Sequence, residues 1–186
     1  SIYVDQWDWE KVITREERTI EYLKQTVQKI VDAVCGTLDE LKWQFPALER
    51  VRLCRETAFA TAQELEDAYP GLTPKERETE AARKWGAVFL MKIGGLLASG
   101  QKHDGRAPDY DDWDLNGDIL IYYPVLDMAF ELSSMGIRVD KDSLLRQLKA
   151  EHAEERLQYE FHKKLMNDEL PLTIGGGIGQ SRLCMI

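Results

Sequence analysis

Three segments with the composition of β-strands follow one another in the middle and second half of the chain, and they restrict the fold more than any other feature. They lie at residues 87–93, 118–123 and 129–139. A parallel strand pair needs a crossover connection, usually a helix, and no helical pattern separates these segments. Strands that follow one another without crossovers pair antiparallel. The sequence therefore predicts an α+β fold in which helices flank an antiparallel sheet.

Apolar residues at helical spacing predict one long helix and several shorter ones. Between Ile20 and Leu41 they recur every three or four positions, behind a capping-box sequence at residues 14–17. Pro46 ends this helix, and Gly36 can interrupt it. Shorter helices are predicted at residues 61–69, 73–84, 140–148 and 153–167. Further strands are predicted at residues 2–9, 51–53 and 172–177, and the last of them enters a helix.

Length, charge and cysteine content narrow the class of protein. The chain has 186 residues, 44% of them hydrophobic, which predicts one domain over residues 1–186. A net charge of −9 repels a phosphate backbone, so no nucleic-acid partner is expected. Three widely spaced cysteines favour free thiols in a reducing compartment, and we expect a cytoplasmic protein. No apolar run approaches the roughly 18 residues of a membrane span, so no membrane partner is expected.

The first predicted strand alternates in an unusual way. Gln6 and Asp8 share one of its faces, and Trp7 and Trp9 share the other. Polar and apolar residues occur on both faces. We therefore expect one face of this strand to line a site.

Five aspartates lie in the segment from residue 109 to residue 118: Asp109, Asp111, Asp112, Asp114 and Asp118. The last three match the start of a calcium loop, but Tyr123 stands where a bidentate Glu is needed, and a strand follows where a helix is needed. A loop over an active site is the preferred interpretation, with a solvated acidic turn as the alternative. Arg106 beside Tyr110 and Asp111 supplies both charges that a zwitterion requires.

Polar residues on the strand at residues 129–139 point to a ligand. With an irregularity near Gly136, the side chains of Glu131, Ser133 and Arg138 can share one face. Such charges on an inner sheet face are costly unless a ligand or an ion satisfies them. The alternative is an exposed face with incidental charges.

The glycine-rich segment at residues 175–182 has two interpretations. Its glycines let a base or a phosphate approach the backbone, with Arg182 in the first helical turn beyond them. It lacks both the dinucleotide fingerprint and the P-loop sequence, and a tight packed turn gives the same string. The histidines have no metal-ligand spacing, and His152 and His162 are expected to face solvent on helices. No nucleophile has an evident base, so the chemistry expected here depends on positioning and charge.

Six blocks of sequence together resemble one enzyme family. They lie at residues 3–10, 86–90, 106–113, 115–120, 130–138 and 173–182. In this order they are similar to ammonia-dependent asparagine synthetase, also called aspartate–ammonia ligase. That family is similar to the catalytic core of class II aminoacyl-tRNA synthetases, so the resemblance implies a partial core of that kind.

The resemblance implies a reaction and its requirements. Aspartate, ATP and ammonia give asparagine, AMP and pyrophosphate, with Mg²⁺, through a β-aspartyl adenylate. Adenylation supplies the leaving group that a carboxylate lacks, and the protein stabilises charge that grows on phosphorus. The resemblance also implies a homodimer in the complete protein.

Roles for individual residues follow from the resemblance alone. Gln6 and Arg182 are similar to catalytic residues of the family that also bind ATP. Asp118 and Glu131 resemble the acidic pair that binds ATP and Mg²⁺. The residues that resemble the family's aspartate site are Asp8, Arg106, Tyr110, Asp111, Ser133, Ser134 and Arg138.

The chain also departs from the family pattern. The family chain is longer at both ends, and its N-terminal part holds the first class motif and an aspartate and an arginine that work beside Gln6. The connection between Trp113 and Leu115 is shorter than usual. We therefore expect that these 186 residues alone are inactive or nearly so. The alternatives are an aspartyl-tRNA synthetase-like core and a domain that binds nucleotide or amino acid without turnover.

Overall fold

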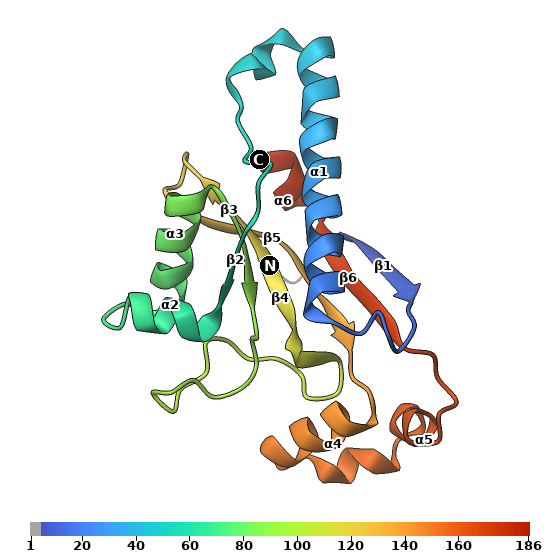
Figure 1. Ribbon diagram of the computed structural model, residues 1–186. Helices are drawn as coiled ribbons and strands as arrows, with labels where there is room; N and C mark the ends of the chain where they lie inside the picture. The colour runs from blue at the N-terminus through green and yellow to red at the C-terminus, as the bar shows by residue number, and fades with distance from the viewer. Residues whose placement is uncertain (1–4) are drawn as a thin grey trace.

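The computed structural model describes residues 5–186, and one six-stranded sheet organises them (Figure 1). The spatial order of the strands is β1-β6-β5-β4-β3-β2. Every neighbouring pair is antiparallel except β2 and β3, which are parallel. The strands are β1 (Gln6–Val12), β2 (Ala58–Thr61), β3 (Ala87–Met91), β4 (Asp111–Tyr123), β5 (Met128–Arg138) and β6 (Thr173–Gly179). The predicted α+β class is confirmed.

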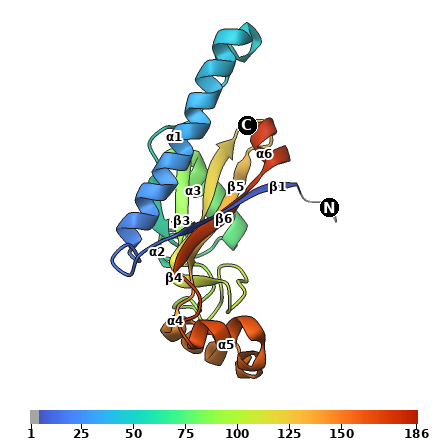
Figure 2. The same cartoon turned by 90° about the vertical axis from the view of Figure 1, so that its right-hand side faces the viewer.

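Helices surround this sheet on both faces and at one end. They are α1 (Ile20–Gln44), α2 (Ala62–Ala68), α3 (Pro74–Trp85), α4 (Lys141–Ala150), α5 (Glu160–Met166) and α6 (Gln180–Met185), with 3₁₀ helices η1 (Pro46–Arg50) and η2 (Glu154–Gln158). The long α1 projects past the sheet, whereas α4 and α5 lie together at its opposite end (Figures 1 and 2). No helix in the described part of the chain is long and apolar enough to cross a membrane.

The parallel pair of β2 and β3 corrects the expectation of a wholly antiparallel sheet. The strand predicted at residues 51–53 is wrong: that segment is irregular, and the strand lies at Ala58–Thr61 instead. Helices α2 and α3 then form the crossover that returns the chain to β3 in a parallel direction. Both helices begin with capping boxes, at Thr61 and at Thr73.

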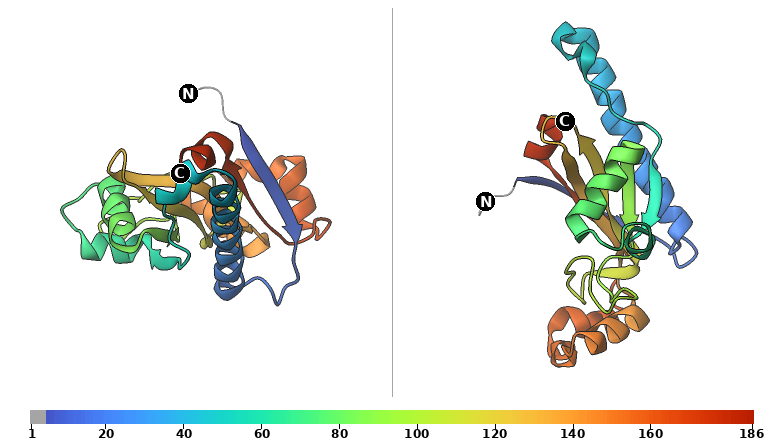
Figure 3. Two further views of the ribbon diagram at one scale, coloured as in Figure 1. Left: turned by 90° about the horizontal axis from the view of Figure 1, so that it is seen from above. Right: turned by 90° about the vertical axis from the view of Figure 1, so that its left-hand side faces the viewer.

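The two faces of the sheet differ in what covers them. Helix α1 packs its apolar stripe on one face, which we call the apolar face; its buried residues include Leu23, Phe89, Ile119 and Met135. On the other face, α2 and α3 cover β2, β3, the adjoining part of β4 and the start of β5, around Leu90, Ala129 and other buried residues. Figures 2 and 3 show the two sets of helices on opposite sides of the strands. The β4–β5–β6–β1 part of that second face carries charged side chains, and we call it the charged face.

Several predicted boundaries need correction. Residues 14–17 form the reciprocal hydrogen bonds of the predicted box, but α1 begins only at Ile20, because Thr19 caps it. Gly36 does not interrupt α1. The helix predicted at residues 153–167 is divided into η2 and α5, because Tyr159 has an extended backbone. Strand β4 begins at Asp111 rather than at residue 118. Of the strand predicted at residues 2–9, residues 2–4 lie outside the described residues, and β1 continues to Val12.

Candidate active site

Glycines of β6 make room on the charged face for side chains from β1. The register pairs Asp8 with Gly177 and Glu10 with Gly175, so these side chains lean over β6. A Cβ atom added at Gly177 would lie 2.7 Å from Asp8 Oδ1 and would also overlap the amide oxygen of Gln6. One added at Gly175 would lie 2.6 Å from a backbone oxygen and would overlap the Glu10 carboxylate. The glycines therefore let three polar side chains approach the centre of the sheet.

Arg138 is the centre of the first charged cluster on this face. Its guanidinium bonds Asp111 of β4 and, at 2.7 Å, Glu10 Oε2 of β1, so it joins three strands. The ring of Tyr110 lies 4.0 Å from the guanidinium carbon and stacks on it. Burial raises the pKa of Asp111 despite the opposing charge of Arg138. Burial would also raise the pKa of Glu10, but its bonds to Arg138 outweigh that effect and lower it.

Asp118 and Arg106 form the second cluster. The Asp118 side chain is 2% exposed, and one of its oxygens bonds the guanidinium of Arg106, which reaches it from the loop before β4. The other oxygen, Oδ1, is buried and has no hydrogen-bond partner among the described residues. Burial raises the pKa of Asp118 to about 6; Arg106 opposes this shift and the charge of Glu131 adds to it. An unpartnered buried carboxylate oxygen is a candidate ligand for a cation.

A pocket of about 400 Å³ opens beside these clusters, at the end of β6. Gln6 of β1, Glu131 and Ser134 of β5, and Arg182 of α6 contribute to its lining. Arg182 Nη1 lies 3.3 Å from Glu131 Oε1 and donates a 2.8 Å hydrogen bond to the Glu131 backbone oxygen. The polar atoms in this lining suit a polar ligand of moderate size.

A β-bulge decides which side chains of β5 face this pocket. Leu132 is the extra residue between the pairs Ser133–Ile119 and Glu131–Leu120. Glu131 consequently lies on the charged face with Ser134. The prediction that Ser133 shares that face is wrong, because its register places it opposite Ile119 on the apolar face, where its hydroxyl is buried. The predicted irregularity near Gly136 exists as a register shift between the pairs Asp111–Arg138 and Asn116–Gly136, but the bulge at Leu132 is what places Glu131 on the charged face.

The calcium-loop alternative does not fit the structure. Asp112 bonds Arg18 at 2.6 Å, Asp114 bonds Arg146 at 2.8 Å, and Asp118 bonds Arg106. Within residues 5–186 no group of three or more histidine, cysteine or acidic side chains is placed to hold a metal ion by itself. These aspartates therefore hold segments of the chain together.

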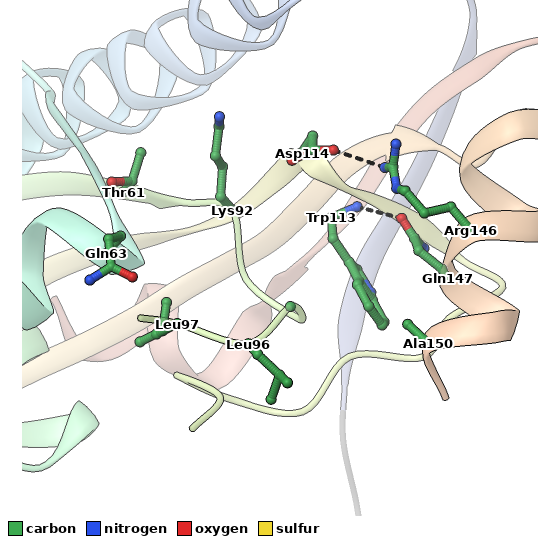
Figure 4. Close-up of a pocket in the computed structure, with 11 residues that line it drawn as sticks. Thr61, Gln63, Lys92, Leu96, Leu97, Trp113, Asp114, Arg146, Gln147 and Ala150 are labelled. Atoms are coloured by element: carbon green, nitrogen blue, oxygen red, sulfur yellow. Dashed lines mark hydrogen bonds and ion pairs between the residues drawn. The ribbon is translucent and has the colours of Figure 1, made fainter. Parts of the chain in front are cut away.

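A second pocket, of about 470 Å³, lies at the start of β4, away from the charged clusters (Figure 4). Arg146 and Gln147 of α4 line it, together with Trp113 and Asp114, and Gln147 Oε1 accepts a 2.8 Å hydrogen bond from the Trp113 backbone. The amide nitrogen of Gln147 also donates to the backbone oxygens of Pro108 and Asp111 at 3.0 Å. The Gln147 side chain, in the wall of this pocket, therefore holds the segment that carries Asp111.

Four residues were missed or misplaced from sequence. Glu10 was not selected, although it lies two residues after Asp8 and so on the same strand face; the strand had been expected to end at Trp9. His162 was predicted to face solvent but is buried and bonds Asp109 at 3.1 Å. His152 is exposed, but it lies in a turn with φ +52°. His103 is buried against Glu78, a contact that no sequence spacing indicated.

Comparison with known proteins identifies the family. The family model for aspartate–ammonia ligase matches residues 1–186. The chain belongs to the aspartate–ammonia ligase family. It is 59% identical over 185 residues to the aspartate–ammonia ligase of Clostridium perfringens and 60% identical over 185 residues to that of Ruminiclostridium cellulolyticum. Each match covers 100% of this chain but 55% of the relative, so this member of the aspartate–ammonia ligase family spans about half the length of the curated relatives it matches.

Solved structures confirm the predicted fold. An aspartyl-tRNA synthetase from Entamoeba histolytica superimposes with a TM-score of 0.63 at 15% identity, over 98% of this chain and 40% of that one. An asparaginyl-tRNA synthetase from Pyrococcus horikoshii, complexed with asparaginyl-adenylate, gives a TM-score of 0.59 at 16% identity, over 95% and 42%. This aspartate–ammonia ligase family chain therefore has the fold of a class II aminoacyl-tRNA synthetase catalytic core.

The structure brings most of the predicted site residues of this family member onto one face. Asp8, Tyr110, Asp111 and Arg138 belong to the first cluster or lie beside it. Arg106 and Asp118 form the second, and Gln6, Glu131, Ser134 and Arg182 line the adjoining pocket. Ser133 also contributes to the lining of that pocket, but its register directs its buried hydroxyl to the apolar face. The functional roles of all these residues remain predictions.

Proposed function

We propose that the charged face serves an ATP-dependent ligase that converts L-aspartate and ammonia to L-asparagine, with AMP and pyrophosphate as products. A carboxylate does not react with ammonia in water, because it offers no leaving group. The side-chain carboxylate of aspartate therefore attacks the α-phosphorus of ATP, and pyrophosphate leaves. Ammonia then attacks the acyl carbon of the β-aspartyl adenylate, loses a proton, and expels AMP.

The two arginine clusters are proposed to bind the amino acid. Arg138 and Arg106 offer planar guanidiniums to carboxylates, and Asp8 and Asp111 offer carboxylates to the ammonium group. Stacking of Tyr110 on Arg138 restricts the guanidinium plane, which favours one orientation of a bound carboxylate.

The pocket at the end of β6 is proposed to bind the nucleotide. Gln6 donates an amide hydrogen to the adenylate phosphate, and Arg182 compensates charge on the outer phosphates. The glycines of β6 allow close approach to the backbone. The asparaginyl-adenylate bound to the Pyrococcus horikoshii synthetase supports an adenylate-forming site on this fold.

Asp118 and Glu131 are proposed to hold Mg²⁺ together with ATP. Mg²⁺ is commonly bound by one or two carboxylates plus substrate phosphates, and the buried, unpartnered Oδ1 of Asp118 suits that role. The charged face also carries an excess of acid: Asp8, Glu10, Asp111, Asp118 and Glu131 stand against Arg106, Arg138 and Arg182. Five carboxylates against three guanidiniums leave two negative charges, which suits cationic ligands. When bound, the ion compensates charge on the phosphates.

The complete protein is proposed to be a homodimer. Trp43 and Phe45 at the projecting end of α1 are exposed apolar side chains of the kind that an interface covers. Sedimentation at several protein concentrations tests this proposal, and a purely monomeric protein would contradict it.

The observation that carries the proposed function is the Arg138 cluster, which joins three strands beside a glycine-lined pocket. The test is calorimetric titration of this chain with L-aspartate and with ATP and Mg²⁺, followed by measurement of pyrophosphate release with and without ammonia. We expect both ligands to bind, and ammonia to convert bound aspartate to asparagine in a protein of the relatives' full length.

Two control ligands and two possible outcomes interpret that test. D-Aspartate and L-glutamate should bind much more weakly than L-aspartate, because the two arginine clusters fix both the chirality and the length of the ligand. Binding without turnover in the longer protein would identify a binding domain instead of a ligase. Failure of this chain to bind L-aspartate would contradict the assignment of the clusters.

A further inference from the structure

Arg106 reaches the charged face from an unusually long irregular segment. Residues 92–110 connect β3 to β4, and within them the only strand-like feature described is an isolated bridge between Leu96 and Lys102. A long connection without regular structure does not fix the position of a side chain by itself. Something else must order the part of the loop that presents Arg106 to Asp118.

A buried histidine–carboxylate pair lies three residues before Arg106. His103 Nε2 is 2.9 Å from Glu78 Oε1, and the two side chains are 1% and 5% exposed. The Nδ1 atom of His103 has no partner among the described residues, which fits the tautomer that donates from Nε2. Glu78 belongs to α3, so this hydrogen bond ties the loop to a helix packed on the sheet.

The charge of Glu78 is compensated by Lys75, and the same lysine connects the pair to the turn of Arg106. Lys75 Nζ lies 3.0 Å from both carboxylate oxygens of Glu78 and 4.0 Å from Asp104. Asp104 accepts a 2.7 Å hydrogen bond from the Gly105 backbone and lies 3.4 Å from Arg106 Nη1. A chain of polar contacts therefore runs from α3 to the guanidinium that bonds Asp118.

We propose that His103 and Glu78 are positioning residues that hold Arg106 in place for a carboxylate of the amino-acid substrate. The proposal rests on the proposed function only for the identity of that substrate. Neither residue of the pair lines the pocket at the end of β6. A buried pair that served packing alone would be replaceable by apolar side chains at little cost, whereas a positioning pair requires its donor and its acceptor.

The main test compares His103→Leu with His103→Gln. Leucine removes the donor, whereas glutamine can donate from its amide nitrogen to Glu78 as histidine does. We expect His103→Leu to weaken L-aspartate binding roughly tenfold, while ATP affinity stays within about twofold, because Arg106 serves the amino acid. We expect His103→Gln to restore aspartate affinity to within about threefold of the original chain.

Glu78→Gln provides a second variant with nearly unchanged volume. It keeps an acceptor for His103 but removes the charge that Lys75 compensates, so we expect aspartate affinity to fall by roughly threefold. Val27→Ala changes a buried residue of α1 on the apolar face. It is the control that lowers stability without altering the charged face. It should lower the melting temperature and leave both affinities unchanged.

A second measurement does not depend on any ligand. Hydrogen exchange at the backbone amides of residues 104–107 should become roughly tenfold faster in His103→Leu and stay near the original rate in His103→Gln. Unchanged exchange there, or equal loss of aspartate and ATP affinity, would overturn the positioning role. If the unsubstituted chain does not bind aspartate, the proposed function fails, and the exchange rates alone decide the inference.

Discussion

The apolar and charged faces of the sheet are built from the same strands but are stabilised in different ways. On the apolar face, residues such as Phe89, Ile119 and Met135 are fully buried beneath α1. On the charged face, the carboxylates of Asp111 and Asp118 are almost as deeply buried, yet each depends on one arginine. Apolar burial stabilises without regard to direction, whereas a buried charge needs its partner at a fixed geometry.

This difference between the faces predicts that the stability of the fold depends mainly on one face and ligand binding mainly on the other. Substitutions on the apolar face should change the free energy of unfolding and leave ligand affinity alone. Substitutions on the charged face should mainly change ligand affinity, because its charged side chains form the proposed aspartate and ATP sites. Four measurements test this separation.

The largest effect is expected from Ile119→Ala on the apolar face. Ile119 is completely buried, so its truncation leaves a cavity beneath α1 and should lower the free energy of unfolding by about 2–5 kcal/mol. Urea unfolding measures the change. Aspartate affinity should stay within about twofold of the original chain; a parallel loss of affinity would show that the faces are not independent.

Neighbouring glycines of β6 allow a matched comparison of the two faces. A Cβ atom at Gly176 would lie 2.5 Å from Met135 Cβ and 2.8 Å from a backbone oxygen, so Gly176→Ala should cost about 1–3 kcal/mol of stability. At Gly177 the obstructing atoms are the ends of the Gln6 and Asp8 side chains, which can move. Gly177→Ala should therefore weaken ligand binding more than it lowers the melting temperature. Equal stability losses in the two variants would contradict the separation.

Arg138→Lys tests the first cluster directly. A lysine keeps the charge but cannot bond Glu10 and Asp111 at once in a planar arrangement. We expect L-aspartate affinity to fall roughly tenfold, or about 1.4 kcal/mol, with a smaller change in unfolding free energy. Calorimetry measures the affinity. Unchanged affinity would remove Arg138 from the proposed amino-acid site.

The pH dependence of stability provides the fourth test. Burial raises the pKa of Asp118 to about 6, above the value of about 3.9 in an unfolded chain. The folded state therefore binds this proton more tightly, and the resulting stabilisation is complete below about pH 4 and is lost as the pH rises through about 6. Asp118→Asn does not titrate, so its stability relative to the original chain should increase between about pH 4.5 and about pH 7.5.

Urea unfolding in the presence of a chelator measures the difference in stability between Asp118→Asn and the original chain. Because both proteins contain all the other titrating groups, the contributions of those groups cancel in the difference. Curves for the two proteins that run parallel across this pH range would show that Asp118 titrates normally.

The fold was largely predictable because its signals are local. Helix caps at Thr73 and Asp140, the stripe of α1 and the apolar strand β3 each depend on neighbouring residues. Strand β2 was misplaced because four residues with an ordinary composition give almost no periodicity. The division between η2 and α5 was missed because one extended backbone, at Tyr159, leaves no sequence mark.

The site was less predictable, since it depends on contacts between distant segments. The strand and glycine patterns indicated Glu131, Arg138 and Arg182 as candidates, and the family resemblance supplied their roles and the role of Gln6. Neither source gave Glu10 as the partner of Arg138, nor the contact between His103 and Glu78, because pairing over such separations follows from strand register and loop path.

The bulge at Leu132 has a consequence for how tolerant β5 is of insertions and deletions. Removing Leu132 itself would restore strict alternation and leave Glu131 opposite Leu120 on the charged face. A scan of single-residue deletions along β5 should therefore find the loss of Leu132 better tolerated than the loss of Glu131, which removes the carboxylate from the charged face. Alignments of related strands should allow a gap at this position inside the sheet, where gaps are normally penalised.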